Sequence, residues 1–67
     1  MKVFIEGMSC AHCQAAVKEA LEAVAGISAV KEVSLQGKFA EAEGSAPAAV
    51  IREAIEEIGF DFIRIEN

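Results

Sequence analysis

The feature that most constrains the fold is a change of hydrophobic period that recurs along only 67 residues. Apolar residues alternate with period two over residues 2–6, which indicates a half-buried strand. They then recur at spacings of three and four over residues 16–24, which indicates an amphipathic helix. A weak repeat of strand, helix and strand follows, without sequence identity between the halves. We expect strands at 2–6, 30–35, 39–43 and 60–66, and helices at 14–25 and 47–58.

This order of elements has one economical arrangement in a chain of this length. It is an α+β fold, the ferredoxin-like βαββαβ sandwich, with a four-stranded antiparallel sheet and two helices on one face. The strand at 2–6 then lies between the strands at 39–43 and 60–66. The segment before the first helix and the turn Gly59–Phe60 come to the same end of the sheet. We expect a single domain that spans residues 1–67.

Side-chain patterning predicts which faces are buried. Glu41 and Glu43 share one face of their strand, so Ala40 and Ala42 are expected on the other face, beneath the helices. The first helix should run to about Ala25, with Gly26 as its stop signal. The expected buried stripe of the second helix is Val50, Ile51, Ala54, Ile55 and Ile58.

The uncovered face of the sheet carries aromatic residues. Val3 and Ile5 point inward, so Phe4 points outward and should neighbour Phe39. The last strand is ambiguous, because two phenylalanines share one parity and two isoleucines share the other. If Phe60 and Phe62 face the helices, then Ile63 and Ile65 join Phe4 on the open face. An exposed apolar patch there would favour weak self-association or docking. The alternative is that the stems of Lys2, Lys38 and Arg64 cover the patch.

The segment Gly7–Cys13 concentrates the reactive side chains. It holds both cysteines, the one histidine and one of the two methionines. Cys10 and Cys13 can turn to one side if Cys13 lies in the first turn of a helix. The unpaired N–H groups and partial positive charge of that turn should lower the pKa of the Cys13 thiol, and to a lesser degree that of Cys10, below the ordinary value of roughly 8.5. Thiolates select Cu(I), Zn(II) and similar ions over Mg or Ca. The segment is therefore either a metal-binding site or a redox-active pair of cysteines.

Composition limits the remaining classes of function. The chain has 6 Lys and Arg against 11 Asp and Glu, for a net charge of −5, which argues against a nucleic-acid partner. No apolar run approaches the ~20 residues needed to span a bilayer, so membrane insertion is not expected. A strand begins almost directly after Met1, which leaves no signal peptide, and a cytoplasmic location is expected. In that setting, two close cysteines favour metal binding or catalysis over a structural disulfide.

The segment Gly7–Cys13 resembles the GMxCxxC signature of heavy-metal-associated domains. These are small copper chaperones of the Atx1/CopZ type and the N-terminal modules of copper-exporting P-type ATPases. The resemblance covers the whole chain, including the pair Gly59–Phe60 ahead of the last strand. It implies that Cys10 and Cys13 bind one Cu(I) in near-linear coordination and that Met8 packs beneath the loop. It also implies a carrier rather than an enzyme, one that passes copper by thiolate exchange to the metal-binding domain of a copper-transporting P-type ATPase.

Three residues bear on the alternatives that the resemblance leaves open. Phe60 should support the loop and shield the sulfurs. In the family this position carries Lys or Tyr in many chaperones and Phe in several ATPase modules. An ATPase module therefore remains an alternative. Ser9 stands where zinc modules often carry Asp, which favours Cu(I) over a Zn, Cd or Hg carrier. His12 is expected to be exposed, with the alternative that it is an extra ligand in a metal-bridged dimer; otherwise a monomer is expected.

A thiol–disulfide oxidoreductase is the alternative from a different class. A CxxC pair at a helix start suits that activity as well, because a thiol of low pKa attacks disulfides readily. The oxidoreductase fold, however, needs more residues and normally a cis-proline that faces the disulfide. The one proline here, Pro47, instead opens the second predicted helix. The sequence therefore favours a copper carrier.

Overall fold

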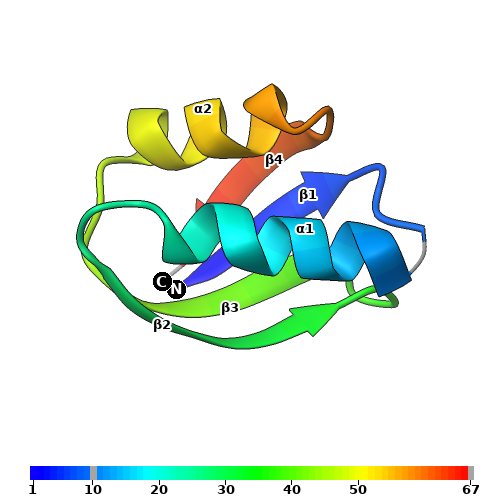
Figure 1. Cartoon of the computed structure of the whole chain (residues 1–67), viewed down its shortest axis with the longest axis horizontal. Coiled ribbons are helices and arrows are strands. Elements are labelled where there is room, and N and C mark those ends of the chain that lie inside the picture. The colour runs from blue at the N-terminus through cyan, green and yellow to red at the C-terminus, as the bar shows by residue number, and fades with distance from the viewer. Residues whose placement is uncertain (10, 67) are drawn as a thin grey trace.

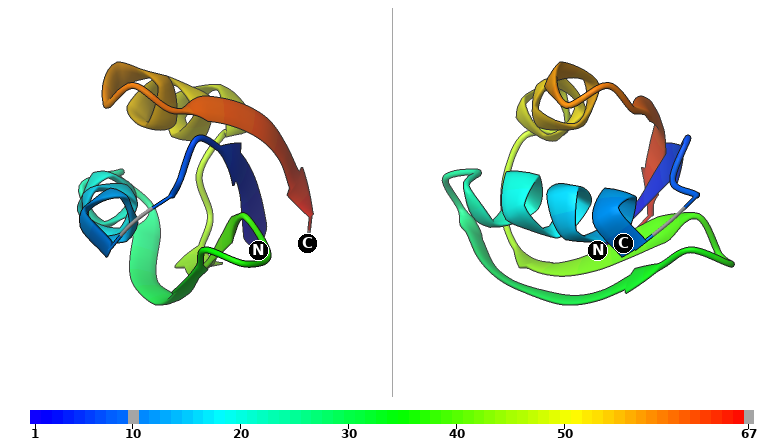
Figure 2. Two further views of the ribbon diagram at one scale, coloured as in Figure 1. Left: turned by 90° about the vertical axis from the view of Figure 1, so that its right-hand side faces the viewer. Right: turned by 45° about the vertical axis from the view of Figure 1, so that its right-hand side comes forward.

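The structure, a computed structural model that describes residues 1–9 and 11–66, has the predicted order of elements (Figure 1). The strands form one antiparallel sheet in the order β2-β3-β1-β4. The sheet curves around the two helices, which cover the same face (Figure 2). The ferredoxin-like sandwich is therefore confirmed. Its elements are β1 (Lys2–Glu6), α1 (Ala11–Glu22), β2 (Ile27–Ser34), β3 (Phe39–Gly44), α2 (Ala48–Glu57) and β4 (Asp61–Glu66).

The core lies between the helices and the concave face of the sheet. The central strand β1 and its neighbour β3 bury their inward side chains completely, as their alternation predicted. Ala40 and Ala42 lie on the buried face of β3, while Glu41 and Glu43 lie on the other. The small alanines let the helices approach the sheet closely. The side chains with no exposed surface are Val3, Ile5, Val17, Leu21, Ala40, Ala42, Ile51 and Ile55.

The first helix ends earlier than predicted, at Glu22 instead of Ala25. A tight turn follows, in which the Val24 N–H donates to the Leu21 carbonyl at 3.1 Å and the Ile27 N–H donates to the Val24 carbonyl at 3.2 Å. Val24 is only 7% exposed although it lies outside the helix. Hydrophobic period reports burial and not hydrogen bonding, which is why the predicted helix was too long. Strand β2 begins correspondingly early, at Ile27 instead of residue 30.

The predicted buried stripe of α2 is correct only at its centre. Ile51 and Ile55 are fully buried, but Val50 is 42% exposed and Ile58 is 39% exposed. These two residues lie on the side of α2 that faces the end of α1 and the turn after it, where the neighbours Ala20 and Ala23 are small. Because those side chains cannot reach across, an open groove remains between the helices.

A β-bulge decides the orientation of β4. Phe62 pairs with Ile5 and Arg64 pairs with Phe4, so the register shifts between these pairs and Ile63 is left without a partner in β1. Consequently Phe62 and Ile65 both pack against the core, while Ile63 is 46% exposed. The prediction that Ile63 and Ile65 share a face is wrong, because one extra residue reverses the parity of a strand.

The open face of the sheet is covered by cationic side chains. The rings of Phe4 and Phe39 are cross-strand neighbours, with centroids 5.7 Å apart, as the topology predicted. The Arg64 guanidinium carbon lies 4.2 Å from the centroid of Phe4, and the Lys2 Nζ lies 5.0 Å from the centroid of Phe39. Both rings are half-buried. The structure therefore favours the interpretation in which long side chains cover this face, although self-association remains a prediction.

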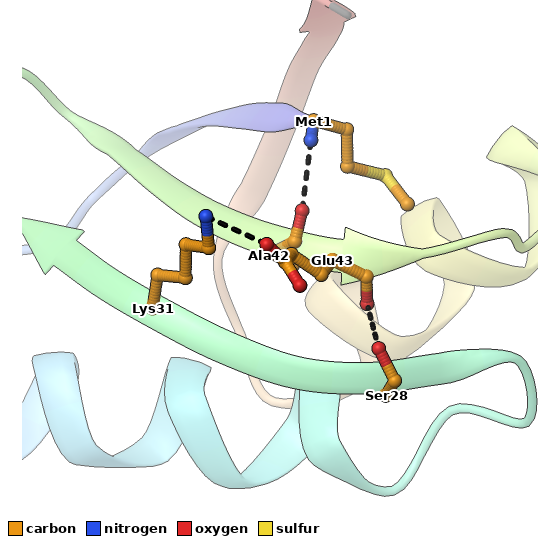
Figure 3. A network of polar contacts seen from close by, with 5 residues as sticks. All are labelled: Met1, Ser28, Lys31, Ala42 and Glu43. Atoms are coloured by element: carbon orange, nitrogen blue, oxygen red, sulfur yellow. Dashed lines mark hydrogen bonds and ion pairs between the residues drawn. The ribbon is translucent and has the colours of Figure 1, made fainter.

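Polar contacts tie the edge strand β2, and the residue that precedes β1, to the inner strand β3 (Figure 3). The Lys31 Nζ lies 2.6 Å from a Glu43 carboxylate oxygen, and the Ser28 hydroxyl donates to the Glu43 carbonyl at 3.2 Å. The terminal ammonium of Met1 donates to the Ala42 carbonyl at 2.8 Å. The hydrogen bond and charge of Lys31 lower the pKa of Glu43, and those of Glu43 raise the pKa of Lys31.

Candidate metal centre

The loop that carries the cysteine motif begins at Gly7, directly after β1. Gly7 has φ of +102°, a region that L side chains rarely adopt, and a Cβ built on it would lie 3.2 Å from Cδ1 of Phe60. The Phe60 ring therefore lies against the Gly7 backbone. This contact confirms that the turn between α2 and β4 lies beside the loop that leads into α1. A side chain at position 7 would be strained and would displace the ring.

Met8 turns from this loop into the core. Its side chain is 7% exposed and belongs to the cluster formed by both helices and β1. Phe60 is half-buried against the same cluster. The burial of Met8 agrees with the predicted packing into the core, and its support of the metal loop stays a prediction.

Cys13 is the third residue of α1 and is half-buried against the core cluster. Its position in the first turn agrees with the prediction. That turn contains no acidic residue, so its backbone N–H groups and partial positive charge act on the thiol without a neighbouring carboxylate from the same turn. Cys10, the other predicted ligand, lies outside the described residues.

His12 is exposed on α1, as predicted from its position between the cysteines. A role for His12 as an extra metal ligand remains a prediction. Over residues 1–9 and 11–66, no three His, Cys, Asp or Glu side chains gather in a group that could hold a metal ion. Within that part of the chain, Cys13 is thus the thiol on which a metal site can be built.

Gln14 is a positioning residue that sequence reasoning missed. Its side-chain amide donates to the Val33 carbonyl of β2, which ties the first turns of α1 to the edge of the sheet. A glutamine beside a cysteine on a predicted helix usually indicates a solvent-exposed position, so no local signal identified this contact. This contact holds α1 against β2 at the residue that follows Cys13.

The charges at this end of the molecule are mainly negative. Glu6 and Asp61 stand opposite each other in the pairing of β1 with β4. Lys38, in the turn between β2 and β3, lies 3.5 Å from Glu6 in an exposed ion pair. The positive charge of Lys38 is thus already paired with the carboxylate of Glu6. Among the described features at this end of the molecule, the N-terminus of α1 is the one that favours an anionic sulfur.

A ferredoxin-like sandwich with a cysteine in the first turn of α1, after a Gly-Met loop, defines a small metal-binding domain. The model of the heavy-metal-associated domain family matches residues 2–61. The chain therefore belongs to the heavy-metal-associated domain family.

Relatives and solved structures agree with this family. The copper chaperone CopZ of Staphylococcus aureus is 37% identical over 62 residues, which cover 88% of this chain and 90% of the relative. A solved CopZ metallochaperone is 29% identical, with a TM-score of 0.85 and coverage of 94% of this chain and 97% of the other. A copper binding domain from HMA7, a P-type ATPase, is also 29% identical, with a TM-score of 0.83 and coverage of 96% and 92%. This chain is thus similar both to chaperones and to an ATPase domain.

The helices of the described region are short. The 12 residues of α1 and the 10 residues of α2 give neither helix the length or apolar character needed to cross a membrane.

Proposed function

We propose that this chain is a copper chaperone that carries one Cu(I) between the thiolates of Cys10 and Cys13. The proposal includes transfer of the ion to the metal-binding domain of a copper-transporting P-type ATPase. Its support from relatives is the 37% identity to a protein named copper chaperone CopZ. In this role the chain is a carrier, not an enzyme. The predicted single domain over residues 1–67 and the cytoplasmic location stay predictions.

The position of Cys13 is the observation that carries this proposal. A thiol in the first turn of α1, half-buried against the core, is held on one side by packing and remains accessible on the other. Thiolate is favoured there over thiol by the helix N-terminus. Soft thiolate ligands in turn select Cu(I) over the hard cations Mg and Ca. With Cys10 as the second ligand, the site has two thiolates.

Two-thiolate coordination suits transfer better than storage. Cu(I) with two ligands can accept a third thiolate from a partner before it gives up one of its own, so the ion moves without ever being released to water. In this scheme Met8 and Phe60 support the loop, and Phe60 also shields the sulfurs on the side of the Gly59 turn. No cationic side chain from that turn neutralises the site, because Phe60 stands there.

An anaerobic Cu(I) titration against a competing chelator tests the two ligands. We expect one Cu(I) per chain for the wild type, and loss of tight binding in Cys10→Ser and in Cys13→Ser with the fold retained. Ser9→Ala is the matched control, since it changes an exposed residue of the same loop without removing a thiol. Binding should weaken as the pH falls, because protons compete for the thiolates. Tight, stoichiometric binding by Cys10→Ser would overturn the model.

The same titration with Zn(II) addresses the alternative cargo. A two-thiolate site lacks the four ligands that zinc usually takes in proteins. We therefore expect Zn(II) to bind more weakly than Cu(I) relative to the chelator used for each. Stronger retention of Zn(II) would make the chain a zinc carrier instead.

A module of a heavy-metal ATPase is the second candidate. It is supported by the 29% identity to a copper binding domain from a P-type ATPase and by Phe60. An immunoblot of the source cells with an antibody against this chain separates the two. A band near the 7.1 kDa of this sequence supports the chaperone, whereas a much larger band in the membrane fraction supports the module.

A further inference from the structure

An apolar groove of about 410 Å³ runs between α1 and α2. Its size falls at the lower end of the ~300–1,000 Å³ that is usual for binding pockets. Val50 and Ile58 belong to its walls, where they are 42% and 39% exposed. Most of the other lining side chains are alanines, so the floor is smooth and apolar. The described lining residues are Ala20, Ala23, Val24, Ala25, Val50, Glu53, Ala54, Glu57 and Ile58.

The charged side chains that line this groove are both negative. Glu53 and Glu57 lie one turn apart on α2, are exposed, and make no ion pair with any residue that the structure describes. On the neighbouring face of the same helix, Arg52 forms its ion pair with Glu56 at 3.3 Å. Like charges spaced by four residues destabilise a helix slightly, and a carboxylate in the last turn opposes the helix dipole. The groove side of α2 therefore carries negative charge that the described chain does not neutralise.

The C-terminus of α1 adds to this negative potential. The last turn of α1 contains no basic residue, and the chain that follows it, Ala23–Ala25, forms one end of the groove. The partial negative charge at the C-terminus of α1 thus lies at that end of the groove. An apolar floor with an anionic rim is complementary to a ligand that is apolar on one face and cationic beside it.

We propose that the groove between α1 and α2 docks a cationic amphipathic helix of a partner protein. Apolar side chains of that helix, spaced by three or four residues, would lie against Val50 and Ile58, and its Lys or Arg side chains would face Glu53 and Glu57. A second copy of this chain fits less well. A symmetric contact through the groove would bring the same carboxylates of both copies together.

This proposal does not depend on copper. The groove residues are separate in sequence from Gly7–Cys13, and none of them is a proposed metal ligand. A Cys10→Ser/Cys13→Ser double variant should bind the helix as the wild type does. Failure of the groove proposal and failure of the copper proposal can therefore be told apart.

The probe is a synthetic 18-residue helix with blocked ends, leucines along one face and lysines elsewhere, added to ¹⁵N-labelled protein. We expect amide shifts around Val50, Ala54 and Ile58, and binding that weakens with added salt. Glu53→Gln/Glu57→Gln should reduce the affinity about tenfold. Glu32→Gln/Asp61→Asn, which changes the net charge equally at exposed positions on the sheet, away from the groove, should not.

Two further probes separate specific docking from attraction between opposite charges. A peptide of the same composition with its leucines scattered, and one with glutamate in place of lysine, should both fail to bind. Val50→Ser, at a position already exposed, should weaken binding without loss of the fold. Equal binding of the scattered peptide, equal affinity of the two double variants, shifts centred on the open face of the sheet, or dimerisation of the protein through the groove would each overturn the proposal.

Discussion

At the scale of single residues, two glycines with similar backbone angles have different surroundings. Gly26 has φ of +98°, and a Cβ built on it would lie 2.1 Å from the Ser45 carbonyl oxygen, where the two loops cross. The Ser45 N–H donates to the Gly26 carbonyl at 2.8 Å at the same crossing. Gly59 has φ of +96°, and nothing lies within 4 Å of its built Cβ. Comparing substitutions at these two glycines therefore separates the free-energy cost of a positive φ from the cost of a steric clash.

Gly26→Ala should therefore destabilise the protein more than Gly59→Ala. Strain at a positive φ costs on the order of 1–3 kcal/mol in both variants, and only Gly26→Ala must also displace a backbone oxygen. Urea unfolding of the two variants and the wild type measures the difference. Equal free energies of unfolding for the two variants would contradict the close approach of the loops at Gly26.

Phe60→Ala tests the side chain beside the metal loop. The ring is half-buried, so we expect a loss of about 1–3 kcal/mol, below the ~3–5 kcal/mol of a fully buried ring. Loss of copper to a chelator should become faster, because water reaches the sulfurs. Phe62→Ala is the control, since that half-buried ring packs against the same core without contact to Gly7 in the described structure. If both variants release copper at the wild-type rate, Phe60 has a packing role alone.

At the scale of elements, the pair Lys31–Glu43 joins β2 to β3. The pKa of Glu43 is lowered from its ordinary 4.5. The charge of Glu43 therefore stabilises the folded protein above pH 4.5, and this stabilisation is lost as the pH falls through the folded pKa. The pKa of Lys31 is raised from 10.5, so its contribution is present below that value and is lost as the pH rises through the folded pKa. Both side chains are exposed, so the effect on stability is small.

Glu43→Gln should therefore be slightly less stable than the wild type between about pH 5 and pH 10, and the difference should vanish in acid. Chemical unfolding at a series of pH values measures this dependence. Glu22→Gln, at an exposed glutamate outside the described ion pairs, is the control. Its free energy of unfolding relative to the wild type should not change comparably as the solution becomes acidic. A difference that stays unchanged at every acidic pH at which the protein remains folded would mean that the charge of Glu43 contributes nothing.

At the scale of the whole molecule, one face of the sheet has no helix over it. Arg64 and Lys2 lie over the rings of Phe4 and Phe39 there, each close enough for a cation–π contact. Their stems reduce the apolar surface that another molecule could cover. We expect this cover to keep the metal-free protein monomeric.

Sedimentation over a concentration series tests that expectation. Wild type and Phe4→Ser should both remain monomeric, whereas Lys2→Ala/Arg64→Ala should associate, because it exposes both rings. Lys18→Ala/Arg52→Ala removes the same charge from exposed positions on the helices and is the matched control. Association of the wild type that Phe4→Ser abolishes would favour the docking interpretation of this face.

The sequence by itself determined the order of the elements, the faces of β1 and β3, the burial of Met8 and the helical position of Cys13. Each of these depends on residues close together in the chain. Alternation with period two assigns a strand's faces, and the helical period of the residues after Cys13 places Cys13 at a helix start. The two proposed ligands were identified for the same reason, since their chemistry is concentrated in one segment.

Only the tertiary structure decided the end of α1, the exposure of Val50 and Ile58, and the face to which Ile65 points. Val50 has the period of a core residue, but it is exposed because the residues opposite, Ala20 of α1 and the alanines of the turn after it, are small. Ile65 points inward because the bulge at Ile63 shifts the register of β4 against β1 by one residue. Such outcomes depend on the shape of a surface formed by residues that are distant in the sequence. Hydrophobic periodicity carries no information about the size of the side chains on that surface.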